Sequence, residues 1–240
     1  MPWSHASRRA DPPAMDPLAG STWSAPATVA GFARSPPNLV LLEFAETELQ
    51  RLGTARALDL GCGAGRNAVP LAGLGFDVVG TDLSWPMLSA AAERAREDRV
   101  DARVSLVLAP MDLVPAGDRT FDLVIAHGIL NLARSATEFR QALRETARVA
   151  KPGAALFVFT FSRNTLSPEA VPVAGEPFVF TEFSGQPQCF LTATELISEV
   201  GDAGFALDAG VPLREYNRPR PGSLCAGKVP VIYEAAFRYR

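Results

Sequence analysis

The chain has 240 residues, of which 48% are hydrophobic and 20% charged, and its formal net charge is −3. This composition supports a buried core and excludes a wholly disordered chain, while the length suits one α/β domain with additions better than two domains. The sequence has no long basic run of the kind that nonspecific binding to phosphates needs, so we expect no nucleic-acid partner.

Strand-like and helix-like segments alternate along the chain, which is typical of βαβ units and a parallel sheet. A helix is expected from about Asn38 to Gly53, because apolar residues recur at helical spacing and glycine ends helices. A second helix is expected over 66–74, and Ser84 and Pro86 mark the start of a third. The strands predicted in this half of the chain are 55–60, 77–81, 103–109 and 121–126.

The second half continues the alternation with one interruption. A helix ends at about Ala150, Lys151-Pro152-Gly153 forms a turn, and a strand follows over 154–161. Residues 162–190, rich in proline and phenylalanine, are predicted to be an insertion on the substrate side. A helix over 192–203 and strands over 205–209 and 229–237 complete the chain. The prediction is a doubly wound α/β domain over 36–240, with a mostly parallel seven-stranded sheet and an insertion after the fifth strand.

The ends and the cysteines bear on location. The proline-rich N-terminus does not resemble a secretory signal, and we expect residues 1–35 to form a flexible tail or a lid. Cys62, Cys189 and Cys225 are too few and too far apart for a disulfide framework or a zinc site. No apolar run has the length of a membrane span. We therefore expect a cytoplasmic protein with no metal and no membrane partner, and the oligomeric state stays open.

A glycine-rich turn follows the first predicted strand, in the segment Asp59-Leu60-Gly61-Cys62-Gly63-Ala64-Gly65-Arg66. Alternating glycines between a strand and a helix let a ligand approach the backbone, and the helix start offers free N–H groups to a negative group. A dinucleotide fingerprint needs a third glycine where this chain has Arg66, so the turn disfavours a nicotinamide oxidoreductase. A plain connecting turn is the weaker interpretation.

Several separate motifs resemble those of class I S-adenosylmethionine-dependent methyltransferases. They are the glycine turn, Asp82 after the second strand, Met111-Asp112 after the third, Phe121-Asp122 in the fourth strand, and Lys151-Pro152-Gly153 before the fifth. Gly65-Arg66-Asn67 is also similar to tellurite-resistance and thiopurine-type members. The resemblance implies a Rossmann-like methyltransferase fold, S-adenosylmethionine as cofactor and a small-molecule methyl acceptor.

The resemblance also implies roles for individual residues. Asp59 would lie near the amino group of the methionine moiety, Asp82 would take the two ribose hydroxyls, and Asp112 would lie near the adenine amine. Asp82 as a capping acid and Asp112 as a turn residue are the alternatives. The complete set expected at the cofactor is Asp59, Gly61, Cys62, Gly63, Gly65, Arg66, Asp82, Leu83, Met111, Asp112 and Ala126.

His127 directly follows the fourth strand, at the sheet edge where open α/β folds bind ligands. It is the leading candidate for a catalytic base or a substrate-orienting group, with a packing role as the alternative. We expect Phe178, Phe183 and Tyr216 to line the acceptor pocket, although phenylalanines more often build core.

Three other functions remain open at this point. A nucleic acid methyltransferase is disfavoured because Ala126-His127-Gly128-Ile129 stands where amine-methylating enzymes of DNA carry a Pro-Pro-aromatic motif. Protein methylation is possible, but no peptide groove follows from the sequence. A protein that binds the cofactor without turnover would carry the same glycine turn and Asp82.

Overall fold

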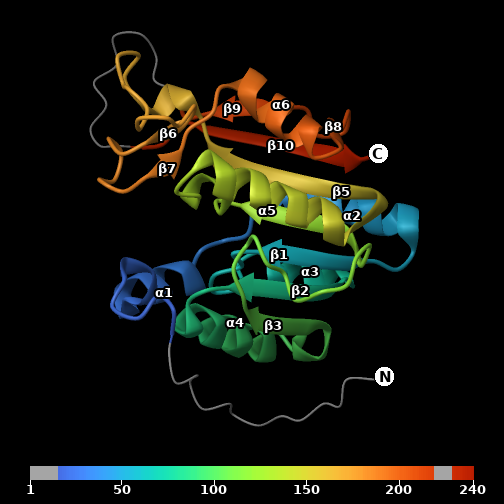
Figure 1. The fold of residues 1–240 in the computed structure, drawn as a ribbon. Coiled ribbons are helices and arrows are strands. Elements are labelled where there is room, and N and C mark those ends of the chain that lie inside the picture. Colours follow the sequence, from blue (N-terminus) through green and yellow to red (C-terminus); the bar gives the residue numbers. More distant parts are fainter. Residues whose placement is uncertain (1–15, 219–228) are drawn as a thin grey trace.

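The computed structural model describes residues 16–218 and 229–240 and contains one large sheet covered by helices (Figure 1). The strand order is β3-β2-β1-β4-β5-β10-β8, and β9 pairs with the part of β10 that β8 leaves free. The first five strands are parallel, and β10 runs antiparallel to β5. The strands are β1 (Arg56–Leu60), β2 (Asp77–Asp82), β3 (Val104–Leu108), β4 (Phe121–His127), β5 (Ala150–Phe161), β8 (Phe205–Leu207), β9 (Arg214–Tyr216) and β10 (Ile232–Tyr239). The doubly wound, mostly parallel sheet predicted from the sequence is confirmed.

Helices cover both faces of this sheet. Helices α2 (Leu39–Leu52), α3 (Ala68–Leu74) and α4 (Trp85–Glu97) pack on one face, and α5 (Ala136–Val149) and α6 (Ala193–Asp202) pack on the other. Side chains that cap first-turn N–H groups start most of these helices, among them Asn38, Ser84 and Thr192. Alternating strand residues therefore bury apolar side chains on both faces, as in a parallel sheet.

Two local predictions differ from the structure. Helix α3 begins at Ala68 rather than at residue 66, because the glycine turn extends through Asn67. The predicted turn Lys151-Pro152-Gly153 is instead an irregular stretch inside β5, where the pairing register with β4 shifts. Lys151 is held there by an ion pair to Asp122, with Nζ 2.8 Å from Oδ2. The acid of the fourth-strand motif thus ties neighbouring strands together.

The described part of the N-terminal extension is a helical segment. Residues 22–24 form a short 3-10 helix, and α1 (Pro26–Ala33) follows and contacts α4. The Asp16 carboxylate accepts from the Trp85 N–H at 3.3 Å and from the Ser24 hydroxyl at 2.8 Å, so it fixes the segment at the start of α4. These contacts hold residues 16–35 against α4, and the expectation that residues 1–35 form a flexible tail or a lid stays a prediction. Residues 1–15, with His5, and Cys225 lie outside the described residues.

The insertion after β5 contains a small hairpin, in which β6 (Val179–Phe180) pairs with β7 (Gln188–Cys189), and a 3-10 helix at 163–165. Two further 3-10 helices lie elsewhere in the chain, at 101–103 and 130–132. Figure 1 places α1 and the hairpin at the side toward which β1 and β2 point, which is the carboxyl edge of the parallel strands. Among the described residues, no helix is both long and apolar enough to cross a membrane.

Candidate functional site

The glycine turn after β1 has a backbone that only glycine adopts easily. Gly61, Gly63 and Gly65 have φ angles of 64°, 53° and 73°. A Cβ on Gly61 would lie 2.6 Å from Ile129 Cδ1, and one on Gly65 would lie 3.1 Å from the Ala91 Cβ. A Cβ on Gly63 would meet nothing closer than Phe32 Cδ1 at 3.7 Å. Packing therefore requires two of these glycines, whereas Gly63 leaves space in front of the loop.

A small cavity of about 40 Å³ lies against this turn. Its walls come from the end of β1, the glycine turn, the end of β4 and helix α1. The lining residues are Phe32, Asp59, Gly61, Cys62, Gly63, Arg66, Asn67 and His127. Five of the residues predicted at the cofactor, Gly61 among them, therefore line one cavity with His127. The cavity lies at the carboxyl edge of the parallel strands, where such folds bind ligands.

Two charged side chains on the cavity wall have buried atoms with no protein partner. Asp59 is 2% exposed, and neither its Oδ2 nor the Nε of Arg66 has a hydrogen-bond partner. No ion pair within 4.0 Å joins the two among the described residues. Burial and the nearby Asp82 carboxylate raise the pKa of Asp59 to about 7, and burial lowers the pKa of Arg66. Such unpartnered buried charges are costly, so they indicate a missing polar ligand of mixed charge.

Asp82, at the end of β2, faces the same glycine turn. Its Oδ2 accepts from the Gly63 N–H at 2.9 Å and its Oδ1 from the Ser84 N–H at 2.8 Å. Burial raises the pKa of this carboxyl group, although hydrogen bonds from backbone N–H groups oppose the shift. Each carboxylate oxygen has further acceptor capacity, so this arrangement can still bind a pair of hydroxyls.

Cys62 packs under the turn against Gly80 of β2. A Cβ on Gly80 would lie 2.8 Å from the Cys62 sulfur, so the strand needs glycine at this point. Sequence reasoning missed Gly80, although a glycine inside a strand indicates close packing of a neighbouring group. The Cys62 thiol is buried, and burial raises its pKa well above the ordinary value, which makes it an unreactive packing group.

Six of the residues predicted at the cofactor do not line the cavity, and two of these, Gly65 and Asp82, belong to the glycine turn and to the end of β2 that faces it. Leu83, Met111 and Asp112 lie farther along the sheet edge, after β2 and β3, and Ala126 points its methyl group into the core beneath α5. Ala126 therefore presents only its main chain toward this side of the sheet. The roles of these residues stay predictions.

His127 belongs to a hydrogen-bonded chain that sequence reasoning did not find. Asn38, the N-cap of α2, contacts His127 Nε2 through Nδ2 at 3.2 Å and donates to Glu234 Oε2 at 2.7 Å. Glu234 Oε1 accepts from the Tyr216 hydroxyl at 3.0 Å. The His127 ring stacks on Phe159, with centroids 4.0 Å apart. The sequence signal was an acid, Glu234, within the largely apolar segment 229–237 that was predicted as a strand.

The aromatic residues predicted for the acceptor pocket have mainly packing roles. Phe178 is 1% exposed and packs edge-on against Phe139, so it belongs to the core rather than to a pocket wall. Phe183 packs on Phe161 and Phe190, and the hydroxyl of Tyr216 is bound to Glu234. Burial of these phenylalanine rings stabilises the insertion as a satellite of the main core.

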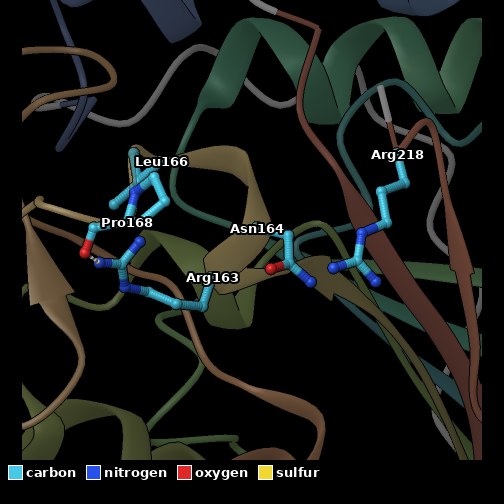
Figure 2. Close-up of a pocket in the computed structure, with 5 residues that line it drawn as sticks. All are labelled: Arg163, Asn164, Leu166, Pro168 and Arg218. Carbon is cyan, nitrogen blue, oxygen red and sulfur yellow. Dashed lines mark hydrogen bonds between the residues drawn. The ribbon is translucent and has the colours of Figure 1, made fainter. Parts of the chain in front are cut away.

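A second, more open hollow lies beyond β5 at the same edge of the sheet. Figure 2 shows its lining side chains, with Asn164 and Arg218 reaching toward each other and Arg163 turned toward Pro168. The Arg163 guanidinium donates to the main-chain oxygens of 167, 168 and 170 and lies 4.7 Å from the centroid of the Phe180 ring. Arg163 therefore holds the insertion together and has little capacity left for a ligand.

The fold and the glycine turn define a class of cofactor-binding domain, and comparisons with known proteins agree. A family model described as "Methyltransferase domain" matches residues 57–153. A Burkholderia thailandensis 1,6-didemethyltoxoflavin-N1-methyltransferase, solved with S-adenosylhomocysteine, superposes with a TM-score of 0.60 at 19% identity, over 82% of this chain and 77% of that one. At this identity the likeness concerns the fold alone.

Curated relatives establish the family. A ubiquinone biosynthesis O-methyltransferase of Xanthomonas euvesicatoria is 31% identical over 71% of this chain and 70% of its own length. One from Azorhizobium caulinodans is 32% identical over 66% of this chain and 62% of its length. The chain therefore belongs to the class I S-adenosylmethionine-dependent methyltransferases. It spans 44% to 62% of the length of the first three curated relatives that it matches.

Proposed function

We propose that this protein transfers the methyl group of S-adenosylmethionine to a small-molecule acceptor by direct displacement. The observation that carries the proposal is the pair of unpartnered buried atoms, Asp59 Oδ2 and Arg66 Nε, on the wall of the cavity at the glycine turn. A methionine moiety ends in an ammonium and a carboxylate, and it would satisfy both atoms at once. An apolar ligand would leave them unpaired.

The other cofactor contacts follow from this placement. Asp59 binds the ammonium group and Arg66 the carboxylate, while Asp82 accepts from the two ribose hydroxyls. The open backbone at Gly63 lets the ligand lie against the turn, with Cys62 beneath it. Leu83, Met111 and Asp112 follow the next strands along the edge, which puts them on the adenine side of the ribose site in this proposal.

The segment 16–35 acts as a lid in this proposal. Phe32 of α1 lines the cavity, and the Ser24 hydroxyl lies 3.0 Å from that of Ser84, next to Asp82. Covering the cavity excludes water and holds the reacting groups in line. Because the methyl group is already activated when the cofactor is bound, the protein has mainly to align the acceptor.

The acceptor would approach between His127, the end of β5 and the insertion. Relatives named for O-methylation in ubiquinone biosynthesis support a small-molecule acceptor. The relevant experiment is a screen of small metabolites for release of S-adenosylhomocysteine, with DNA, RNA and peptide acceptors as parallel arms. Release only with a small molecule supports the proposal. Turnover confined to a macromolecule contradicts it, and calorimetric cofactor binding with no turnover on any acceptor favours a binding protein.

A further inference from the structure

The side-chain amide of Asn38 has one orientation in which all of its hydrogen bonds are made. This orientation determines which nitrogen of the His127 ring carries the proton. Its Oδ1 accepts from the Leu41 N–H at 3.0 Å as the cap of α2. The amide nitrogen therefore faces His127 and Glu234 and has two hydrogens to donate. One goes to Glu234 and the other to Nε2 of His127, so this ring nitrogen is the acceptor.

Three further sets of contacts fix the positions of Asn38, His127 and Glu234. The Asn38 N–H donates to Asn67 Oδ1 at 3.1 Å, which ties the cap to the glycine turn. Strand register places His127, Phe159 and Glu234 in one row across β4, β5 and β10. Glu234 is 4% exposed and also accepts from Tyr216. The carboxylate is thus a fixed acceptor that orients the amide of Asn38.

The contact with Asn38 also fixes where the ring proton lies. With Nε2 accepting from Asn38, the ring proton lies on Nδ1. Burial and the positive charge of Arg66 lower the pKa of His127 to about 3. The charged groups around the ring are Arg66 and Asp59 across the cavity and Glu234 behind Asn38.

We propose that Asn38 and Glu234 are positioning residues that hold His127 as a neutral, stacked wall of the acceptor site, and that His127 does not deprotonate the acceptor. The inference rests on the proposed methyl transfer and deepens it. Of the residues that line the cavity, only His127 and Asp59 are candidate bases, and Asp59 is assigned to the cofactor. Because the His127 wall then supplies no base, the inference favours acceptors that are nucleophilic without one, such as ionised thiols, ionised phenols, stabilised carbanions and uncharged amines, over simple alcohols.

The state of His127 can be measured without any acceptor. The chain contains two histidines, so the His5→Ala variant with ¹⁵N-labelled histidine has a single imidazole to observe by NMR. We expect the Nδ1–H tautomer, unchanged from pH 8 to pH 5. An Nε2–H tautomer, or a titration with a midpoint between pH 6 and 7, would overturn the inference. Because this readout needs no methyl transfer, its failure is distinguishable from failure of the proposed function.

Variants of the network separate positioning from general packing. Asn38→Ser keeps an N-cap oxygen but loses the amide donor, so the cap of α2 should survive. In this variant we expect the His127 tautomer to change and its pKa to move toward the ordinary range. If Asn38→Ser leaves the His127 spectrum unchanged while the protein stays folded, Asn38 does not position the ring.

Activity gives a second, independent test once an acceptor is found. His127→Phe keeps a flat ring on Phe159 but has no nitrogen, whereas His127→Ala removes the wall. We expect kcat of His127→Phe to stay within about tenfold of the original, with a larger loss for His127→Ala and an unchanged pH profile in His127→Phe. Equal losses of a hundredfold or more in both variants, the range of a lost general base, would contradict the inference.

Discussion

Asp59 should make cofactor affinity depend on pH near neutrality. Its pKa is raised to about 7 from an ordinary value of 3.8, with burial as the main cause and the Asp82 carboxylate as the second. The proposed partner, an ammonium group, binds the ionised form. Cofactor binding should therefore release a proton from Asp59 whenever the free protein holds one there.

The magnitude follows from the ionised fraction. With a pKa of about 7, roughly a tenth of the carboxyl groups are ionised at pH 6 and roughly nine tenths at pH 8, so affinity should be about tenfold weaker at pH 6, or about 1.4 kcal/mol. The raised pKa of Asp59 affects the folding stability of the free protein in the opposite direction: cofactor affinity rises with pH, whereas stability falls. Since the folded state binds the proton more tightly than the unfolded chain, Asp59 contributes stability in acid that is lost as the pH rises toward 7.

Calorimetry with S-adenosylhomocysteine at pH 6 and pH 8 measures both quantities. Repeating each titration in buffers of different ionisation enthalpy gives the number of protons released per cofactor bound. We expect nearly one proton at pH 6 and roughly a tenth of a proton at pH 8. Asp59→Asn is the matched control, because it keeps the shape of the side chain but should show weak affinity and no such pH dependence. Equal affinity at the two pH values in the unmodified protein, with no proton release, would refute the reasoning.

Three further changes test separate parts of the structure. Gly61→Ala should lower the free energy of unfolding by about 1–3 kcal/mol through overpacking against Ile129. Gly63→Val should also lose stability, because its φ of 53° disfavours a β-branched residue, and in addition it should abolish cofactor binding by the folded protein. Chemical denaturation and calorimetry measure the two effects, and unchanged cofactor affinity in folded Gly63→Val would contradict the proposed site. Asp16→Ala should release the N-terminal segment, raising its cleavage by protease and weakening cofactor affinity by about 1–2 kcal/mol, whereas unchanged cleavage would count against the lid. Arg238→Leu removes one of two guanidinium partners of the buried Glu48 carboxylate, the other being Arg51, so urea unfolding should show a loss of about 2 kcal/mol. Burial raises the pKa of Glu48, but the hydrogen bonds from arginine outweigh it and lower the pKa below 4.5. The stability that the ion pair contributes should therefore be lost as the pH falls below 4.5. Equal stability of Arg238→Leu and the unmodified protein would refute this role of Arg238.

Much of the fold followed from local patterns in the sequence. Helix caps such as Ser84 and Thr192 and the alternation of apolar segments have short-range causes, so they predicted the elements and the doubly wound sheet correctly. The irregular stretch at Lys151-Pro152-Gly153 was taken for a turn, because its pairing depends on Asp122 in another strand. Contacts of this kind have no signature in the local sequence.

The candidate site was predicted unevenly for the same reason. The glycine turn, Asp59 and Arg66 form one continuous segment, and the structure brings them together with His127 around one cavity. Asn38 and Glu234 are 196 positions apart, and only the tertiary fold brings them into one network with His127. Phe178 was assigned to a pocket but packs in the core, since composition alone does not tell which face of the insertion is buried.

The most direct measurement is calorimetric titration of S-adenosylmethionine into the unmodified protein and into Asp82→Ala, with thermal unfolding as a check that the variant is folded. The account predicts binding at one site and an affinity loss in the variant of about tenfold to a hundredfold, as expected for lost hydrogen bonds to a charged group. The absence of binding heat in the unmodified protein, or equal affinity in a folded Asp82→Ala variant, would contradict it.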